Sequence, residues 1–261
     1  MARGVIGALE WVTGRPRLER RLREFERREA MGGDHRGARL WGAALDCMGI
    51  AVRAPPAEVA RIPARGPVGP VANHPHGLVD GMVVAALVAR VRPDLRVLAR
   101  ALLSGIHEGA AASLIPVPFP HEAGADAAML EMRRRARAHL ARGGLVALFP
   151  AGRVASAPRG WGEAEEGEWS PFTANLIRGS GATVLPVRFG GANSRAYQVA
   201  ARLSPLLRQG SLLREVAAAL DHPQDPVVGE PIPPEAWRER AGDPRAFSAW
   251  LRERTLSLQR P

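Results

Sequence analysis

The chain has 261 residues, 46% of them hydrophobic, which suits one packed α/β domain and excludes a disordered protein. Its net charge of +10 comes from arginine alone, because the sequence contains no lysine, and it predicts attraction to phosphate groups. The single cysteine, Cys47, excludes an intramolecular disulfide and a cysteine metal cluster, which favours a reducing compartment. No apolar run approaches the roughly 20 residues of a membrane span, so we expect neither a secreted nor an integral membrane protein.

Residues 1–55 are predicted to form N-terminal amphipathic helices that belong to the same domain as residues 56–261. The first helix should span about 16–30, and the second about 38–48. In the first, one face is apolar and the rest is charged, the apolar residues being Leu18, Leu22 and Phe25. Two interpretations stay open: the helix docks on the domain with a solvated face, or it rests on anionic lipid. Trp11 and Trp41 could likewise be membrane anchors or ordinary core residues.

The rest of the chain alternates between predicted strands and helices. The strands are expected at 67–72, 95–98, 114–117, 145–149, 183–189 and within 226–232. The helices are expected at about 80–91, 101–106, 125–142, 169–178 and 211–220, and after Asp243-Pro244. This alternation predicts an α/β fold in which helices cover both faces of a mostly parallel sheet.

A turn between the first strand and the helix after it reads Asn73-His74-Pro75-His76-Gly77-Leu78-Val79-Asp80-Gly81. Such a turn can aim an imidazole and a carboxylate at the same cleft. A carboxylate that accepts one ring N–H fixes the tautomer and leaves the other ring nitrogen as a base. His76 is the rival of His74 for this pairing, because an early helix start would place it four residues before Asp80 on the same face. A merely structural pair is the third possibility.

A second stretch, Phe149-Pro150-Ala151-Gly152-Arg153, follows an apolar strand. Gly152 allows the backbone to approach a substrate closely, and Arg153 can offer a forked donor to a carboxylate or phosphate. Arg100 and Arg188 are weaker candidates for the same task. The sequence has no Gly-x-Ser-x-Gly elbow and no phosphate-binding lysine loop, and no compact set of ligands suggests a metal.

Together the two stretches resemble the glycerolipid (lysophospholipid) acyltransferase superfamily. The similarity is greatest to its hemolysin-like, lyso-ornithine-lipid acyltransferase branch, whose blocks read Asn-His-Pro-x-Gly-x-x-Asp-Gly and Phe-Pro-Ala-Gly. Both forms occur here, at Asn73–Gly81 and Phe149–Gly152. Further segments that resemble blocks of this branch lie at 10–15, 92–99, 115–117, 168–169 and 181–194, so the resemblance covers most of the chain.

The resemblance implies an O-acyltransferase in which His74 is the general base and Asp80 orients it. It also implies that the substrate is contacted by Asn73, Gly77, Phe149, Pro150, Gly152 and Arg153. No bound cofactor is expected, because acyl carrier protein or coenzyme A brings the acyl group as a thioester. The acceptor would be a lyso-lipid, taken at an anionic membrane surface on its cytoplasmic face by a peripheral enzyme, and no nucleic-acid partner is expected.

Two departures from the broad superfamily bear on the acceptor and the base. Asp80 lies six residues after His74 instead of five, which fits the hemolysin-like branch. Ala151 stands where the broad family has the glutamate that helps bind phosphate-bearing acceptors, so lysophosphatidate is in doubt. Two alternatives remain: a lysophosphatidate acyltransferase of phospholipid synthesis, and a non-catalytic protein that binds anionic lipid surfaces.

Overall fold

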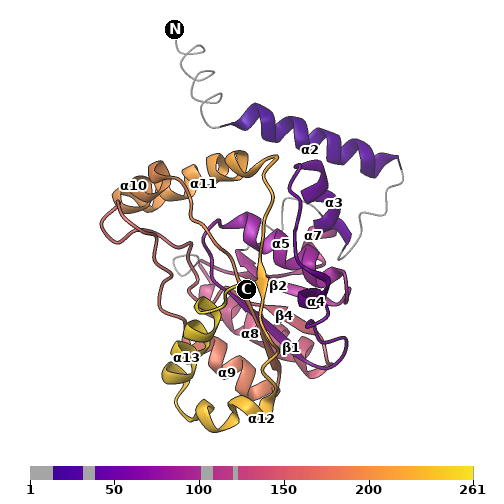
Figure 1. The fold of residues 1–261 in the computed structure, drawn as a ribbon, viewed down its shortest axis with the longest axis vertical. Helices are drawn as coiled ribbons and strands as arrows, with labels where there is room; N and C mark the ends of the chain where they lie inside the picture. Colours follow the sequence, from indigo (N-terminus) through magenta and orange to yellow (C-terminus); the bar gives the residue numbers. More distant parts are fainter. Residues whose placement is uncertain (1–13, 32–38, 101–107, 120–122, 261) are drawn as a thin grey trace.

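A computed structural model describes residues 14–31, 39–100, 108–119 and 123–260 of the chain (Figure 1). The described residues form a six-stranded sheet in the order β3-β2-β4-β1-β5-β6. The strands are β1 (Val68–Ala72), β2 (Leu95–Arg100), β3 (Leu114–Val117), β4 (Leu145–Ala147), β5 (Thr183–Arg188) and β6 (Val227–Val228). Every pairing is parallel except that of β5 with β6. The mostly parallel α/β fold expected from the sequence is therefore confirmed.

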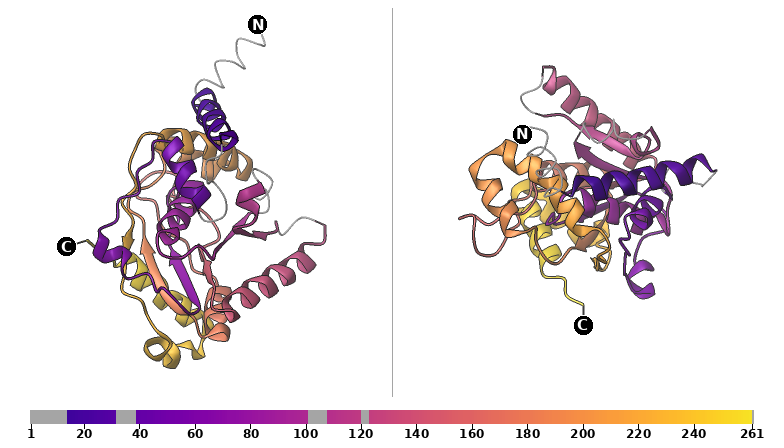
Figure 2. Two further views of the ribbon diagram at one scale, coloured as in Figure 1. Left: turned by 90° about the vertical axis from the view of Figure 1, so that its right-hand side faces the viewer. Right: turned by 90° about the horizontal axis from the view of Figure 1, so that it is seen from above.

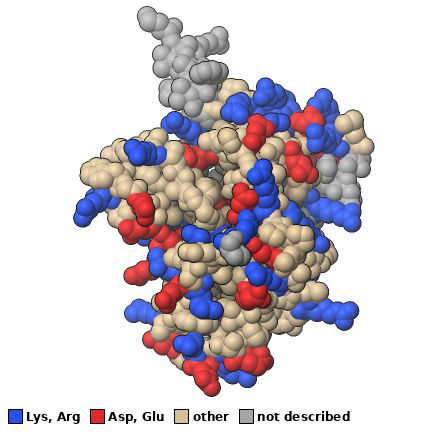
Figure 3. Space-filling model, viewed as in Figure 1, with Lys and Arg blue, Asp and Glu red and all other residues tan. Residues whose placement is uncertain are grey.

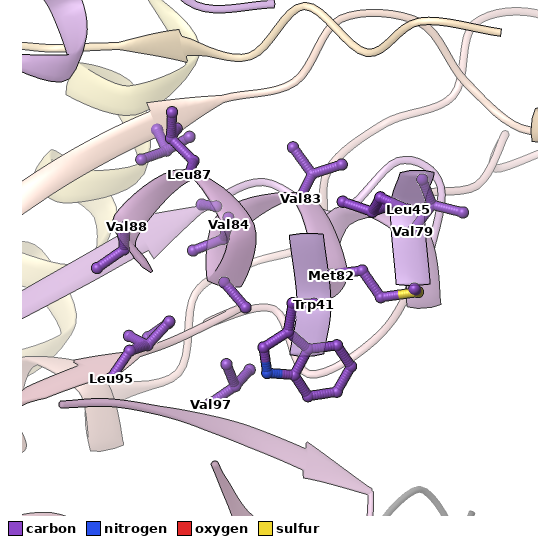
Figure 4. Close-up of a cluster of buried hydrophobic side chains, with 14 of the residues drawn as sticks. Trp41, Leu45, Val79, Met82, Val83, Val84, Leu87, Val88, Leu95 and Val97 are labelled. Atoms are coloured by element: carbon purple, nitrogen blue, oxygen red, sulfur yellow. The ribbon is translucent and has the colours of Figure 1, made fainter. Parts of the chain in front are cut away.

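Helices cover both faces of this sheet, as Figures 1 and 2 show. One face is packed by α3 (Arg39–Cys47), α5 (Leu78–Ala89) and α7 (Glu108–Ala111), and the other by α8 (Ala125–Ala141), α9 (Pro171–Ser180) and α13 (Pro244–Leu256). Alternate residues of a strand point to opposite faces, so Ala72 joins the first core and Val71 the second. Figure 4 shows the first core, where α5 packs against Trp41 of α3 and Val97 of β2.

The remaining elements lie at the ends and edges of the sheet. They are α2 (Arg15–Ala30), α4 (Pro56–Val59), α10 (Arg195–Leu203), α11 (Pro205–Ala219), α12 (Pro234–Trp237) and the 3-10 turn η1 (Arg238–Gly242). At one end of the molecule α2 and α11 pack together, and α10 and α11 form a helical hairpin (Figure 1). None of the described helices combines the length and the apolar character needed to cross a membrane.

The N-terminal helical pair is present as α2 and α3. Trp41 is a core residue, since its ring is buried and its Nε1 donates to Ser113 Oγ at 2.9 Å. On α2, Phe25 is buried, whereas Leu22 is half exposed. Trp11 and the helix expected at 101–106 lie outside the described residues.

Several element boundaries differ from those expected. The helix expected from Trp169 begins at Pro171, because Ser170 Oγ accepts from Phe172 N at 3.2 Å and proline suits the first helical position. The strand expected to reach Phe149 ends its regular pairing at Ala147, with one isolated bridge at Leu148. Helices α4, α10 and α12 were not expected at all.

Candidate active site

The turn after β1 is fixed to the neighbouring strand β5 by one side chain. Asn73 Nδ2 donates to the carbonyl of Phe189 at 2.9 Å, and its Oδ1 accepts from Phe189 N at 2.7 Å. Parallel strands end at the same edge of a sheet, and Asn73 ties two of those ends together. Asn73, which the sequence predicts to contact substrate, therefore fixes the start of the turn to β5.

Gly77 gives the turn its shape. Its backbone angles of φ 76° and ψ −123° lie in a region that side chains strongly disfavour. A Cβ atom at this position would lie 3.2 Å from Leu212 Cδ2 and 3.3 Å from Val154 Cγ2. Gly77 therefore serves the backbone conformation and close packing around the turn, and α5 begins directly after it at Leu78.

Asp80, in the first turn of α5, is completely buried and collects four hydrogen bonds. Oδ2 accepts from the backbone N–H groups of His76 at 2.8 Å and Gly77 at 3.0 Å. The ring Nδ1 atoms of His74 and His76 lie 3.1 Å from Oδ2 and 3.0 Å from Oδ1, respectively. The sequence spacing makes the two histidines rivals for this carboxylate, whereas the structure pairs both with it.

These contacts determine the protonation states of Asp80 and of the two imidazoles. Burial alone would raise the pKa of Asp80, but hydrogen bonds from His74 and His76, together with their charges, hold it below its ordinary value. An ionised carboxylate can only accept, so each imidazole presents Nδ1–H to it and keeps Nε2 as the basic nitrogen. Burial lowers the pKa of His76, yet its hydrogen bond to Asp80 and the charges of Asp80 and Glu215 raise it overall.

The two imidazoles differ in what surrounds them. Their side chains are similarly accessible, at 18% exposed for His74 and 19% for His76. The ring of His74 packs on Phe149, with centroids 4.2 Å apart. The Nε2 atom of His76 faces Gly191, where an added Cβ would lie only 3.2 Å away. The basic nitrogen of His76 thus lies against the backbone of the turn after β5. This favours Nε2 of His74 as the basic nitrogen that a substrate can reach.

Glu166 is a residue of the site that the sequence did not single out. Its Oε2 accepts from His74 N at 3.0 Å, and its Oε1 accepts from Trp169 Nε1 at 3.0 Å. Burial raises the pKa of Glu166, and these two hydrogen bonds oppose that effect. It lies in the stretch 157–167, whose proline, glycine and acidic residues predict only a loop, so no local signal marks it.

The loop Phe149–Arg153 runs beside this group. Gly152 has φ +65°, and its N–H donates to the carbonyl of Phe149 at 2.9 Å, which closes the turn. Pro150 is buried, and its carbonyl accepts from Ser170 N at 3.0 Å. Arg153 is exposed and lies over Gly167. Phe149 therefore reaches His74 directly, while Arg153 faces the neighbouring cleft.

That cleft has a volume of about 810 Å³, and its lining contains more cationic than anionic side chains. Five arginines from four segments line it, namely Arg153, Arg202, Arg208, Arg245 and Arg252. Three glutamates also line it, namely Glu165, Glu166 and Glu168. Among the described residues, no hydrogen bond or ion pair engages the guanidinium groups of Arg153, Arg208 and Arg245. Because Glu166 both lines the cleft and bonds to the backbone of His74, the cleft adjoins the His–Asp turn.

The two weaker arginine candidates make structural contacts. Arg188 donates to the carbonyl of Leu258 at 2.8 Å, which holds the C-terminal segment against β5. Arg100 donates to the carbonyl of Pro118 at 3.2 Å and lies over the ring of Phe119. Within the described ranges, no three His, Cys, Asp or Glu side chains are grouped so that they could hold a metal ion.

Comparison with known proteins gives a likeness of fold. No protein-family model matches the sequence, and no curated protein matches it either. Among solved structures, the chain is similar to the 1-acyl-sn-glycerophosphate (LPA) acyltransferase PlsC from Thermotoga maritima. The match has a TM-score of 0.52 and 16% sequence identity, and covers 84% of this chain and 75% of that one. The chain thus shares the fold of a lipid acyltransferase.

Proposed function

We propose that the protein is an O-acyltransferase that moves a fatty acyl group from a thioester to the free hydroxyl of a lyso-lipid. The observation that carries the proposal is the buried Asp80 carboxylate, which sets the tautomer of His74 and leaves its Nε2 as a base. The fold shared with a lysophosphatidate acyltransferase supports the same reaction class. The chain's own Asn-His-Pro-x-Gly-x-x-Asp-Gly block adds a resemblance at these residues.

In the proposed reaction, His74 Nε2 removes the proton of the acceptor hydroxyl as its oxygen attacks the thioester carbonyl. The new carbon–oxygen bond gives a tetrahedral oxyanion, whose collapse breaks the carbon–sulfur bond. The imidazolium returns its proton to the leaving thiolate. Asp80 stabilises the imidazolium in between, because its lowered pKa keeps it ionised.

The arginine-lined cleft beside the turn is the proposed site for a phosphate or carboxylate group of a substrate. Guanidinium groups bind both kinds of anion through two parallel hydrogen bonds. Arg153, Arg208 and Arg245 supply such groups without an existing partner in the described part of the chain. A coenzyme A or acyl-carrier phosphate and the headgroup of the acceptor both have the required charge.

For the acceptor, we favour a lyso-ornithine lipid or another lyso-lipid over lysophosphatidate. The reason is Ala151, which occupies the position of the superfamily's acceptor-binding glutamate. The rival, a lysophosphatidate acyltransferase, draws support from the substrate named for the structurally similar protein. We place the reaction on the cytoplasmic side of a membrane, with the protein bound at the surface.

The test is acyl transfer from labelled acyl carrier protein and acyl-coenzyme A to a panel of lyso-lipids. The panel contains lyso-ornithine lipid, lysophosphatidate and lysophosphatidylglycerol. We expect a diacyl product whose formation falls about 10²–10⁴-fold in His74→Ala, the range for loss of a general base. His222→Ala is the matched control, because His222 is exposed and lies outside the site, and it should retain full activity.

The pattern of products separates the candidates. A preference for lysophosphatidate would select the phospholipid-synthesis alternative. Equal activity in His74→Ala and the wild type would overturn the proposed base. No product with any acceptor, from a folded protein that still binds anionic vesicles, would select the non-catalytic lipid-surface function.

A further inference from the structure

Exposed apolar side chains gather at one end of the molecule. Within the described part of the chain, eight large hydrophobic side chains are exposed, and five of them lie on α10, on α11 or on the loop fastened to α10. These five are Trp161, Val199, Leu203, Leu207 and Leu213, with exposed fractions of 76%, 45%, 70%, 52% and 60%. Isolated exposed leucines are ordinary, but a contiguous group of this kind marks an interaction surface.

The helical spacing places these side chains on outward faces. Val199 and Leu203 are four residues apart on α10 and therefore neighbours on its surface. On α11, Leu207 and Leu213 are both exposed, and so is Gly210 between them. The inner faces are used for packing, since Tyr197 on α10 and Val216 on α11 are buried.

Hydrogen bonds hold the Trp161 loop against α10. Ala157 N donates to Gln198 Oε1 at 2.7 Å, and Arg202 Nη1 donates to the carbonyl of Pro158 at 2.8 Å. A Cβ on Gly160 would lie 3.6 Å from Arg202 Cδ. Trp161 follows Gly160 directly in this loop, and its side chain is exposed.

The two helices of the hairpin carry more cationic than acidic side chains. Helices α10 and α11 contain four arginines, namely Arg195, Arg202, Arg208 and Arg214, and one acidic residue, Glu215. Glu215 is buried and is bound by Ser194, whose N–H and Oγ donate to its carboxylate at 2.8 and 2.6 Å. Because Arg202 and Arg208 line the cleft, the outer surface of the hairpin combines these apolar side chains with two exposed cations, Arg195 and Arg214. Figure 3 shows the surface over α10 and α11 as mainly uncharged, with both blue and red atoms at its edge.

We propose that the outer face of the α10–α11 hairpin, with Trp161, docks on an anionic lipid bilayer. The leucines would enter the acyl boundary while Arg195 and Arg214 bind headgroup phosphates. The same helices are close to the site, because Leu212 packs at Gly77 and Arg202 and Arg208 line the cleft. The inference rests on the proposed function in one respect: a lipid acceptor is what brings the enzyme to a bilayer.

The decisive experiment compares two leucines of equal exposure. Leu203 is 70% exposed on α10, and Leu130 is 69% exposed on α8. The wild type, Leu203→Asp and Leu130→Asp are sedimented with vesicles of equal parts phosphatidylglycerol and phosphatidylcholine, and with pure phosphatidylcholine. We expect anionic vesicles to be preferred, binding to weaken with salt, and Leu203→Asp to weaken it at least tenfold while Leu130→Asp leaves it unchanged.

A second readout separates this inference from the proposed reaction. Transfer is measured to a short-chain lyso-lipid dissolved as monomers and to a long-chain lyso-lipid in vesicles. Leu203→Asp should retain wild-type transfer to the monomer and lose transfer to the vesicle-borne acceptor. If the wild type transferred no acyl group even to the monomeric acceptor, the proposed function would be contradicted. The vesicle-binding measurement would still test the docking proposal by itself.

Two outcomes would overturn the docking proposal. One is vesicle binding by Leu203→Asp that equals that of Leu130→Asp. The other is a concentration-dependent dimer of the wild type in sedimentation velocity that Leu203→Asp abolishes, without any vesicle binding. In that case a second copy of the chain covers the hairpin.

Discussion

The His–Asp turn and the α10–α11 hairpin lie in contact, yet they are built in opposite ways. In the turn, Asp80 is fully buried and collects four hydrogen bonds. In the hairpin, Leu203 and Leu213 are more than half exposed, with no side chain of the described protein covering them. Leu212 joins the two regions, because it packs where a Cβ on Gly77 would be.

This difference shows which groups are already satisfied within the folded chain and which surface would gain from binding a partner. The turn is complete in itself, since buried polar groups are stable only when they are paired. The hairpin instead retains apolar surface whose burial would be favourable. Substitutions in the turn should therefore lower activity or stability. Substitutions on the outer surface of the hairpin should change the free energy of unfolding only slightly.

The largest effect should come from Asp80→Asn. The amide can offer N–H to the ring, so His74 would turn its Nδ1 lone pair toward residue 80 and carry its proton on Nε2. Without a basic Nε2, acyl transfer should fall on the order of 10⁴-fold. Initial rates with the best acceptor measure this, and thermal unfolding checks the fold. Asp225→Asn, at an exposed site, is the control. Activity within tenfold of the wild type would rule out the orienting role of Asp80.

Gly77→Ala should have the next largest effect, on stability. A non-glycine residue at φ 76° and ψ −123° costs about 1–3 kcal/mol, and its Cβ must also displace Leu212 or Val154. We expect the free energy of unfolding to drop by at least this amount in urea titrations. An unchanged midpoint would mean that the turn tolerates other backbone angles.

The pH dependence of stability tests the pairing of His76 with Asp80. Because its pKa is raised in the folded protein, His76 contributes stability that is fully present below its unfolded value near 6.5. That contribution is lost as pH rises through the folded pKa, with a slope of at most about 1.4 kcal/mol per pH unit. His76→Asn should lack the slope. Parallel stability curves for the two proteins from pH 6 to 9 would contradict the ion pair.

Gly210→Ala is the counterpart of Gly77→Ala in the hairpin and should have the smallest effect. No atom lies within 4 Å of an added Cβ, and the residue is inside α11. Alanine in place of glycine within a helix should raise the free energy of unfolding by roughly 0.5–1 kcal/mol. Urea unfolding measures the change, and a loss of stability would show that the open face of α11 is already covered.

The same contrast explains what could be predicted from the sequence. His74 and Asp80 are six residues apart, so a strand, a turn and a helix start suffice to bring them together. The apolar runs and their alternation likewise predict the parallel sheet. The order of its strands could not be predicted, since β1 pairs with β4 and β5 through contacts more than 70 residues apart.

Residues whose role depends on tertiary contacts were the ones that sequence reasoning missed. Glu166 lies in an irregular acidic loop and meets His74 only in the fold. Helix α10 had a start signal in Ser194, whose Oγ accepts from Tyr197 N at 3.2 Å. That serine ends the stretch Gly190-Gly191-Ala192-Asn193-Ser194, whose glycines indicate a turn and give no sign of a helix. Arg188 shows a second limit, because an arginine in an apolar strand can also bind a backbone carbonyl, here that of Leu258.

The four donors around Asp80 have a consequence for motion. His76 and Gly77 belong to no helix or strand, and such segments usually exchange their amide hydrogens quickly. Their N–H groups, however, point at a carboxylate that water cannot reach. These two amides should therefore exchange as slowly as those of β1 and open only with the domain as a whole. The turn has the dihedral angles of a loop, but its hydrogen bonds to Asp80 make it as rigid as the sheet. A substrate must therefore adapt to the shape of the turn.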